Sequence, residues 1–132
     1  MAMEIVFPGG KRVDALHNNF TIKTDQNPKR GGEGSSPEPF ALFLASIGTC
    51  AGIFVLVFCQ QRDIPTDTIK LVMDWTRSTK TKLIDRFTID VQLPSDFPEK
   101  YREAVKRAAE LCSVARHFEN PPEIEVTSSV KV

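Results

Sequence analysis

The sequence predicts an α+β fold with the element order βββ-α-ββ-α-β. Short segments in which apolar and polar residues alternate occur near both ends and in the middle of the chain, as in half-buried strands. Between them lie residues 40–59, a twenty-residue run without a formally charged side chain, and a later amphipathic segment. With 132 residues and 41% hydrophobic content, the chain is expected to form one compact domain over residues 1–132.

Three short antiparallel strands are predicted at the start. Residues 4–7 and 12–16 flank a Pro-Gly-Gly turn, and residues 20–24 alternate apolar and polar side chains after a pair of asparagines. Residues 25–37 are rich in glycine, proline, serine and charge, which is typical of a loop. The backbone of such a loop could lie against a ligand or a partner.

The uncharged run is predicted to form a long helix. Ser36 is the expected N-cap, Pro37 the first helical residue and Glu38 a favourable first-turn acid, and the helix is expected to end near Arg62. At about 1.5 Å per residue, the run could also cross a hydrocarbon core of roughly 30 Å. We expect a buried helix rather than a membrane span, because small and polar residues recur along the run and no aromatic belt flanks it.

A second hairpin and a second helical segment are predicted in the other half of the chain. Residues 70–76 and 83–93 show period-two patterning, and residues 98–118 present one apolar face on which Cys112 should point inward. A last strand is predicted from the alternating residues Ile124, Val126, Ser128 and Val130. One small sheet could hardly cover a helix that is apolar on all sides, so we expect a homodimer in which the sheets of two chains wrap the central helices.

The composition argues against several classes of protein. Seventeen basic residues balance seventeen acidic ones, so no bulk field favours binding to nucleic acid or to anionic lipid. Three cysteines without tight spacing do not resemble a secreted disulfide framework, and no leader-like segment is recognised, which predicts a cytoplasmic protein. His17 and His117 show no paired metal-ligand spacing, so no metal cofactor is expected.

Two of the thiols are the candidates for redox chemistry. A thiol reduces peroxide only as the thiolate, so a peroxidatic cysteine needs a cation or aligned donors nearby. No neighbour within the long helix supplies this to Cys50, and the nearest cationic candidates along the sequence are Lys11, Arg12, Arg116 and His117. Cys112 could resolve a Cys50 sulfenic acid as a disulfide if the two Cα atoms approach within about 7 Å.

Each of these residues also has a structural interpretation. Free cysteine is among the most buried residue types, so Cys50 and Cys112 could simply pack in the core, as we expect for Cys59. Glu38 is equally typical of a first-turn helix charge, and the basic residues are typical of a solvated surface. Both interpretations stay open on the residues alone.

Three segments together resemble the OsmC/Ohr family, the osmotically inducible protein C and organic hydroperoxide resistance proteins. Residues 31–37, Gly-Gly-Glu-Gly-Ser-Ser-Pro, are similar to the glycine-rich loop that precedes the family's helix. Residues 42–50 resemble its leucine- and alanine-rich helix leading to the first cysteine, and residues 112–114 resemble its Cys-Pro-Val-Ser segment with the second. The resemblance covers nearly the whole chain, and two cysteines in these settings, about sixty residues apart, are far more specific than either alone.

The resemblance implies a two-cysteine thiol peroxidase that acts on organic hydroperoxides. By this likeness the protein would be an intertwined homodimer with two sites at the subunit interface. Cys50 would be the peroxidatic thiol and Cys112 the resolving thiol, with Arg12, or Lys11, holding the thiolate. No prosthetic group is implied, and the reductant would be an external dithiol, often a lipoylated protein.

The sequence departs from the family pattern at two places. The family's glutamate lies nine or ten residues before the first cysteine and pairs with the arginine, whereas Ala41 and Phe40 stand at these positions here. Glu38 lies roughly 18 Å from Cys50 along a straight helix, so it could take this role only if the first turn unwinds or the loop folds back. A serine also replaces the proline that follows the second cysteine.

Two functions follow as alternatives. The first is a thiol-dependent hydroperoxide reductase, in which an apolar pocket along the helix favours alkyl or lipid hydroperoxides. The second is a non-catalytic member of the same fold that binds a small hydrophobic ligand while both cysteines are merely packed. The missing glutamate supports the second function, and rapid loss of two thiols on addition of a hydroperoxide would support the first.

Overall fold

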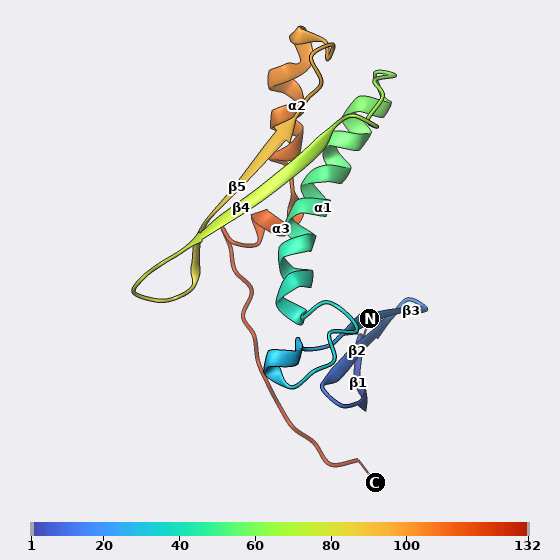
Figure 1. Cartoon of the computed structure of the whole chain (residues 1–132), viewed down its shortest axis with the longest axis vertical. Coiled ribbons are helices and arrows are strands. Elements are labelled where there is room, and N and C mark those ends of the chain that lie inside the picture. The colour runs from blue at the N-terminus through green and yellow to red at the C-terminus, as the bar shows by residue number, and fades with distance from the viewer. Residues whose placement is uncertain (1, 132) are drawn as a thin grey trace. The chain divides into compact units, whose positions relative to one another are not determined.

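The structure, a computed structural model, describes residues 2–131 and confirms the predicted α+β class (Figure 1). Two small antiparallel sheets and one long helix, α1 (Pro39–Gln60), are its main elements. The described residues form two compact units, one up to residue 46 and the other from residue 47 onwards. The prediction that they make up a single domain stays a prediction.

The N-terminal unit contains the three predicted strands. β1 (Glu4–Gly9), β2 (Arg12–His17) and β3 (Phe20–Thr24) pair as an antiparallel sheet in this order. The turn between β2 and β3 places both of its central asparagines at positive φ, which asparagine tolerates better than most residues. Alternation and turn residues therefore located this sheet correctly.

The loop after β3 is fixed by the carboxylate of Asp25, which is buried. Asp25 accepts hydrogen bonds from the Ser35 hydroxyl at 2.6 Å and from the backbone N–H groups of Gln26, Glu33 and Ser35. The Ser35 hydroxyl bond is the largest of the effects that hold the pKa of this carboxyl at about 2. The loop also contains a short 3-10 helix, η1 (Pro28–Arg30), and is therefore an ordered structure of its own.

Replacing Gly32 with alanine is expected to destabilise this loop. A Cβ at Gly32 would lie 2.0 Å from the Gln26 carbonyl oxygen, a backbone atom that cannot move away alone. Overpacking of this kind typically costs about 1–3 kcal/mol of unfolding free energy, measurable by thermal or urea denaturation. Gly48→Ala is the matched control, because its Cβ would meet only Met73 atoms at 3.9 Å and more, in ordinary contact. Equal stability of the two variants would contradict this account.

The long helix begins later than predicted. α1 starts at Pro39, and Ser36 is not its N-cap, because the chain before it is held by a hydrogen bond from the Asp25 N–H to the Pro37 carbonyl. Proline at the first helical position explains the actual start, since its missing N–H would be unpaired there in any case. The end at Gln60, followed by a turn, lies close to the predicted one.

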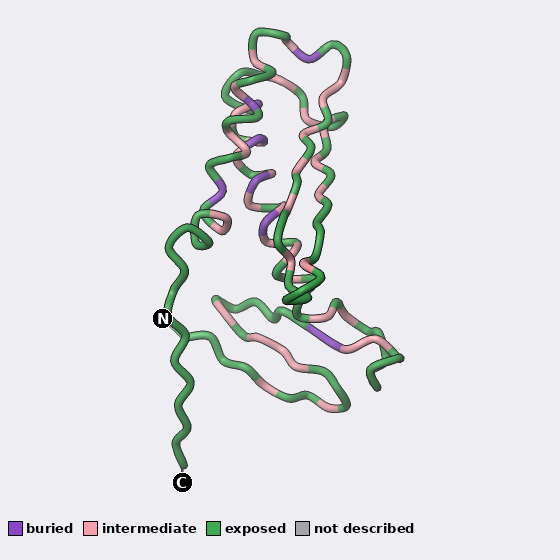
Figure 2. The backbone as a smooth tube through the Cα atoms, turned by 90° about the vertical axis from the view of Figure 1, so that its left-hand side faces the viewer, coloured by how far each residue is buried: buried purple, intermediate pink, exposed green. Residues whose placement is uncertain are grey.

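Only one stripe of α1 is buried within the chain. Its buried residues recur every fourth position and appear as separate purple segments along the helix in Figure 2: Ile47, Ala51, Val55 and Cys59. On the opposite face Ile53 and Val57 are 49% and 41% exposed although both are large and apolar. α1 is long and apolar enough to cross a membrane, with a mean hydropathy of 2.4. Core helices of soluble proteins also meet these two criteria.

The second unit packs a hairpin and short helices against α1. β4 (Lys70–Arg77) and β5 (Ile84–Gln92) form the predicted antiparallel pair. Beyond them follow η2 (Glu99–Tyr101), α2 (Arg102–Ala109) and α3 (Ser113–Arg116). A small core of four buried side chains joins these elements to α1: Val55, Cys59, Phe97 and Val105.

Two predictions for the C-terminal part need correction. The second helical segment is interrupted between α2 and α3, because Cys112 has a non-helical backbone and its sulfur caps α3. The last strand, predicted over residues 124–130, is absent from the described part of the chain, where these residues have no regular secondary structure and are exposed. Alternation marks a segment that can become a strand, but a strand also requires a neighbour to supply hydrogen bonds.

Candidate active site

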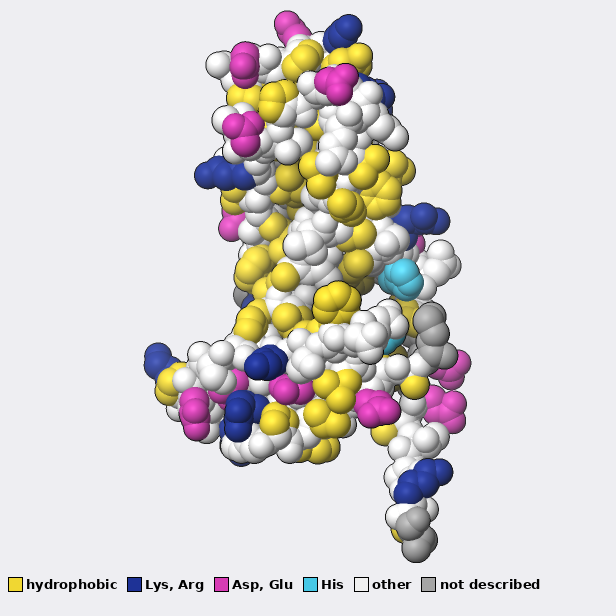
Figure 3. All heavy atoms as spheres, turned by 90° about the vertical axis from the view of Figure 1, so that its right-hand side faces the viewer, with side chains coloured by type: hydrophobic (Ala, Val, Ile, Leu, Met, Phe, Trp, Pro, Cys, Tyr) yellow, Lys and Arg dark blue, Asp and Glu magenta, His cyan; other side chains and the backbone are white. Residues whose placement is uncertain are grey.

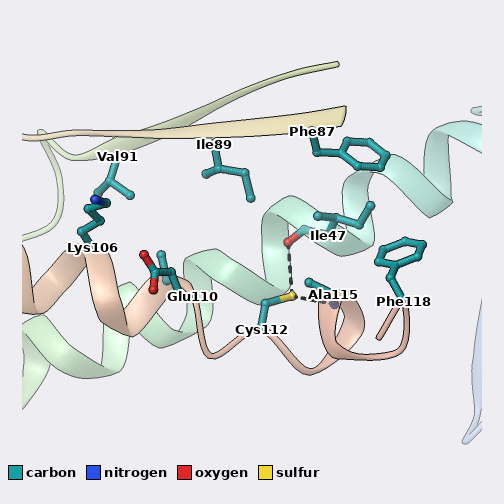
Figure 4. A pocket seen from close by; sticks show the side chains of 10 residues that line it. Ile47, Phe87, Ile89, Val91, Lys106, Glu110, Cys112, Ala115 and Phe118 are labelled. Carbon is teal, nitrogen blue, oxygen red and sulfur yellow. Dashed lines mark hydrogen bonds between the residues drawn. The ribbon is translucent and has the colours of Figure 1, made fainter. Parts of the chain in front are cut away.

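Cys50 and Cys112 come together within the second unit. Cys50 lies on α1, one turn after Ile47, and Cys112 lies at the start of α3. The Cys112 thiol contacts the Ile47 carbonyl at 3.7 Å and accepts a hydrogen bond from the Ala115 N–H at 3.4 Å (Figure 4). The two side chains are themselves in hydrogen-bonding contact, and both are free thiols. Residues 62 positions apart in sequence thus form one dithiol pair.

Neutral hydrogen-bond donors lower the pKa of Cys50 to about 7. The largest contribution is the backbone N–H of Val114, followed by the hydroxyl of Ser113, whose oxygen lies 3.6 Å from the Cys50 sulfur. The Cys112 thiol and the Ser113 N–H add to this effect, and burial opposes it. Sequence reasoning searched for a cation and missed these donors. The available signal was the Cys-Ser-Val segment, in which a serine directly follows the second cysteine.

The other two thiols are held in the protonated form. Burial raises the pKa of Cys112, which is only 2% exposed, and the adjacent Cys50 raises it further. Burial likewise raises the pKa of Cys59, which is fully enclosed in the core as the sequence suggested. Cys50 is therefore the thiol that ionises most easily.

The reactivity of Cys50 is expected to follow a titration centred near pH 7. A lowered pKa means that the thiolate predominates above that value and is lost as the pH falls below it. Alkylation of Cys50 by iodoacetamide should therefore rise between about pH 6 and pH 8 and then level off, whereas Cys112 and Cys59 should react only at higher pH. Peptide mass spectrometry of pulse-labelled, reduced protein reports each cysteine separately. Simultaneous labelling of Cys50 and Cys112 at every pH would contradict this assignment.

The charged residues that the family resemblance pointed to, Lys11, Arg12 and Glu38, belong to the N-terminal unit, whereas Arg116 and His117 belong to the second. Arg12 donates a hydrogen bond from Nε to the Gly9 carbonyl at 3.3 Å, and Lys11 is exposed in the same turn. Glu38 accepts hydrogen bonds from Asn27 at 2.7 Å and from Arg30 at 3.2 Å. Sequence reasoning did not single out Arg30 as the partner of Glu38. The approach of Lys11, Arg12 or Glu38 to Cys50 stays a prediction.

His117 contacts the backbone of Ser113, the residue whose hydroxyl faces the Cys50 sulfur. Its Nδ1 is 2.6 Å from the Ser113 carbonyl oxygen. A carbonyl only accepts, so Nδ1 carries the proton and donates. His117 therefore helps to fix the turn that presents Ser113 to Cys50.

An apolar pocket of about 310 Å³ opens next to Cys112 (Figure 4). Side chains from β5, α1 and the chain after α3 form its apolar wall, among them Ile47, Phe87, Ile89, Val91 and Phe118. Its charged groups are Lys106 of α2 and Glu110, which directly follows this helix. Cys112 lines this pocket and Cys50 does not. Among residues 2–131 there is no cluster of three or more histidine, cysteine or acidic side chains able to hold a metal ion.

Comparison with known proteins identifies the family. The family model for OsmC-like protein matches residues 32–127. A crystal structure of a Psychrobacter arcticus 273-4 protein shares a TM-score of 0.71 at 18% identity, covering 88% of this chain and 86% of that one. The OsmC like protein from Mycoplasma pneumoniae has a TM-score of 0.69 at 15% identity, covering 91% and 87%. The organic hydroperoxide resistance protein OhrB of Bacillus subtilis has a TM-score of 0.51 at 16% identity, covering 92% and 93%.

No curated protein is detectably similar in sequence. The structural likenesses, all at low identity, establish a shared fold. The family model covers well over half of the chain, including both members of the dithiol pair. The chain belongs to the OsmC-like protein family.

Proposed function

We propose that this chain is a thiol peroxidase that reduces organic hydroperoxides. The Cys50 thiolate attacks the terminal oxygen of the hydroperoxide, so that an S–O bond forms while the O–O bond breaks. The products are a Cys50 sulfenic acid and, after the alkoxide takes up a proton, an alcohol. The Cys112 thiol then attacks the sulfenic sulfur, which forms the disulfide and releases water. An external dithiol reduces this disulfide by exchange, and no prosthetic group takes part.

The contact between an easily ionised thiol and a protonated one is the observation that carries this proposal. Donors around Cys50 favour the thiolate that the first step requires, and burial keeps Cys112 protonated until a sulfenic acid forms beside it. Membership of a family with organic hydroperoxide resistance proteins adds independent support. The apolar surroundings of the site favour an alkyl or lipid hydroperoxide over a small polar one.

The proposal includes a homodimer in the cytoplasm. α1 leaves large apolar residues exposed on the face opposite its buried stripe, and Figure 3 shows hydrophobic side chains over much of the face that carries this helix. A second copy of the chain would cover them. The reductant would be a cytoplasmic dithiol such as a lipoylated protein.

A thiol count tests the proposal directly. Under an oxygen-free atmosphere, reduced protein receives less than one equivalent of cumene hydroperoxide. The reaction is quenched in acid, and the remaining free thiols are titrated. The expected result is rapid loss of two thiols per hydroperoxide, with Cys50 and Cys112 joined in one disulfide-linked peptide pair. Thiol loss no faster than that of free cysteine would reject the proposal.

The pocket beside Cys112 favours a second candidate function, the binding of a small hydrophobic ligand without catalysis. Its volume of about 310 Å³ lies at the lower end of the range for ligand sites, and its wall is mostly apolar. Titration with an apolar fluorescent probe separates the two candidates. Displaceable binding to protein that fails the thiol count supports the binder, and efficient oxidation supports the peroxidase.

A further inference from the structure

We propose that Ser113 is a catalytic residue of this chain, whose hydroxyl donates a hydrogen bond to the Cys50 thiolate in place of a cation. This inference rests on the proposed function, because it assigns a role in the same reaction. Ser113 touches the reacting atom itself, with its Oγ 3.6 Å from the Cys50 sulfur. A thiolate has no proton and can only accept, so a hydroxyl at this position becomes the donor when Cys50 ionises.

The hydroxyl of Ser113 has no role in starting α3. The sulfur of Cys112 performs this task by accepting the Ala115 N–H, as Figure 4 shows. Ser113 is the first residue of α3, a position at which proline would serve the helix equally well. Proline would supply neither a hydroxyl nor an N–H. The serine therefore adds two donors to the sulfur of Cys50 without a structural requirement for either.

Cys112 and His117, both in the second unit, are titratable groups that contact Cys50 or Ser113. Cys112 shares the hydrogen-bonding contact with Cys50 and is held protonated by burial. His117 donates from Nδ1 to the Ser113 carbonyl, a bond that persists in the protonated ring because Nδ1 carries a proton in both forms. His117 thus acts as a positioning residue for Ser113, and no charged side chain is among the causes of the lowered pKa of Cys50.

Activation by neutral donors has a distinctive consequence. The attraction between a thiolate and an exposed lysine or arginine is screened by salt, whereas a short hydrogen bond from a hydroxyl or N–H is hardly affected. The pH midpoint for alkylation of Cys50 should therefore stay nearly constant between low and high ionic strength. A midpoint set by Lys11 or Arg12 would rise with salt.

The experiment compares Ser113→Ala with Ser113→Thr, which keeps the hydroxyl, and with Ser95→Ala, which removes a hydroxyl from an exposed loop. The pH profile of iodoacetamide labelling at Cys50 is measured by peptide mass spectrometry on fully reduced, folded protein. Ser113→Ala is expected to raise the midpoint by about one pH unit, which lowers the thiolate fraction at pH 7 about fivefold. Ser113→Thr and Ser95→Ala should keep the native midpoint.

Ser113→Pro provides a second test should the alanine variant fold poorly, because the first helical position accepts proline. It should raise the midpoint at least as far as alanine does. An unchanged midpoint in a folded alanine or proline variant would overturn the role of Ser113. Labelling needs no hydroperoxide, so the two proposals can fail separately. If the protein fails the thiol count but Ser113→Ala still shifts the labelling midpoint, the peroxidase is rejected and the role of Ser113 is supported.

Discussion

Replacing Cys50 with serine is expected to abolish rapid hydroperoxide reduction, with a loss of about a thousandfold or more. A serine hydroxyl is not ionised near neutral pH, so no nucleophile remains to break the O–O bond. Cys112 cannot substitute, because burial raises its pKa and keeps it protonated. Stopped-flow consumption of cumene hydroperoxide under single-turnover conditions measures the effect without any external reductant.

Cys112→Ser is the informative counterpart of this variant. It should consume one equivalent of hydroperoxide at nearly the native rate and then stop, because the sulfenic acid on Cys50 has no thiol to attack it. Dimedone labelling of Cys50 would detect this intermediate. Cys59→Ala is the matched control, since it removes a core thiol that takes no part in the reaction. Native activity of Cys50→Ser, or loss of the first turnover in Cys112→Ser, would contradict the assigned roles.

The parts of the fold that the sequence revealed are those decided locally. The strands around the Pro-Gly-Gly and Asn-Asn turns follow from alternation and from backbone angles that those turn residues tolerate. The start of α1 was placed two residues early because a single hydrogen bond from the Asp25 N–H holds Pro37 outside the helix. The side-chain pattern near Ser36 carries no trace of this constraint, which depends on a residue eleven positions earlier.

The site was predictable in its thiols but not in its electrostatics. The two cysteines were found because their settings resemble a known family. The donors to Cys50 were missed because they come from α3, and the distance from the Ser113 hydroxyl to the Cys50 sulfur depends on how α3 packs against α1. Glu38 was considered as a distant partner of an N-terminal cation, and η1 instead brings Arg30 within 3.2 Å of it. Since Arg30 is 70% exposed, this pair contributes little to stability.

Placing a charge on the exposed apolar face of α1 is expected to dissociate the proposed dimer. Val57 is 41% exposed and apolar, on the face of α1 opposite the buried stripe. An aspartate at this position would be buried without a partner charge in the proposed dimer, and it would occur twice in a two-fold interface. Each buried aspartate should weaken the free energy of dimerisation by at least about 3 kcal/mol, which raises the dimer dissociation constant about a hundredfold.

Val57→Asp should therefore convert a dimeric protein into a monomer at micromolar concentration, as measured by light scattering after size-exclusion chromatography. Val57 is preferable to Ile53 for this purpose, because it lies two turns from Cys50 rather than one and so perturbs the thiol less. Thr68→Asp adds the same charge to an exposed loop and should leave the mass unchanged. A native protein that is monomeric, or a Val57→Asp variant that keeps the native mass, would contradict the proposal that a second copy covers α1. A native protein extracted only with detergent would instead assign this apolar face to a membrane.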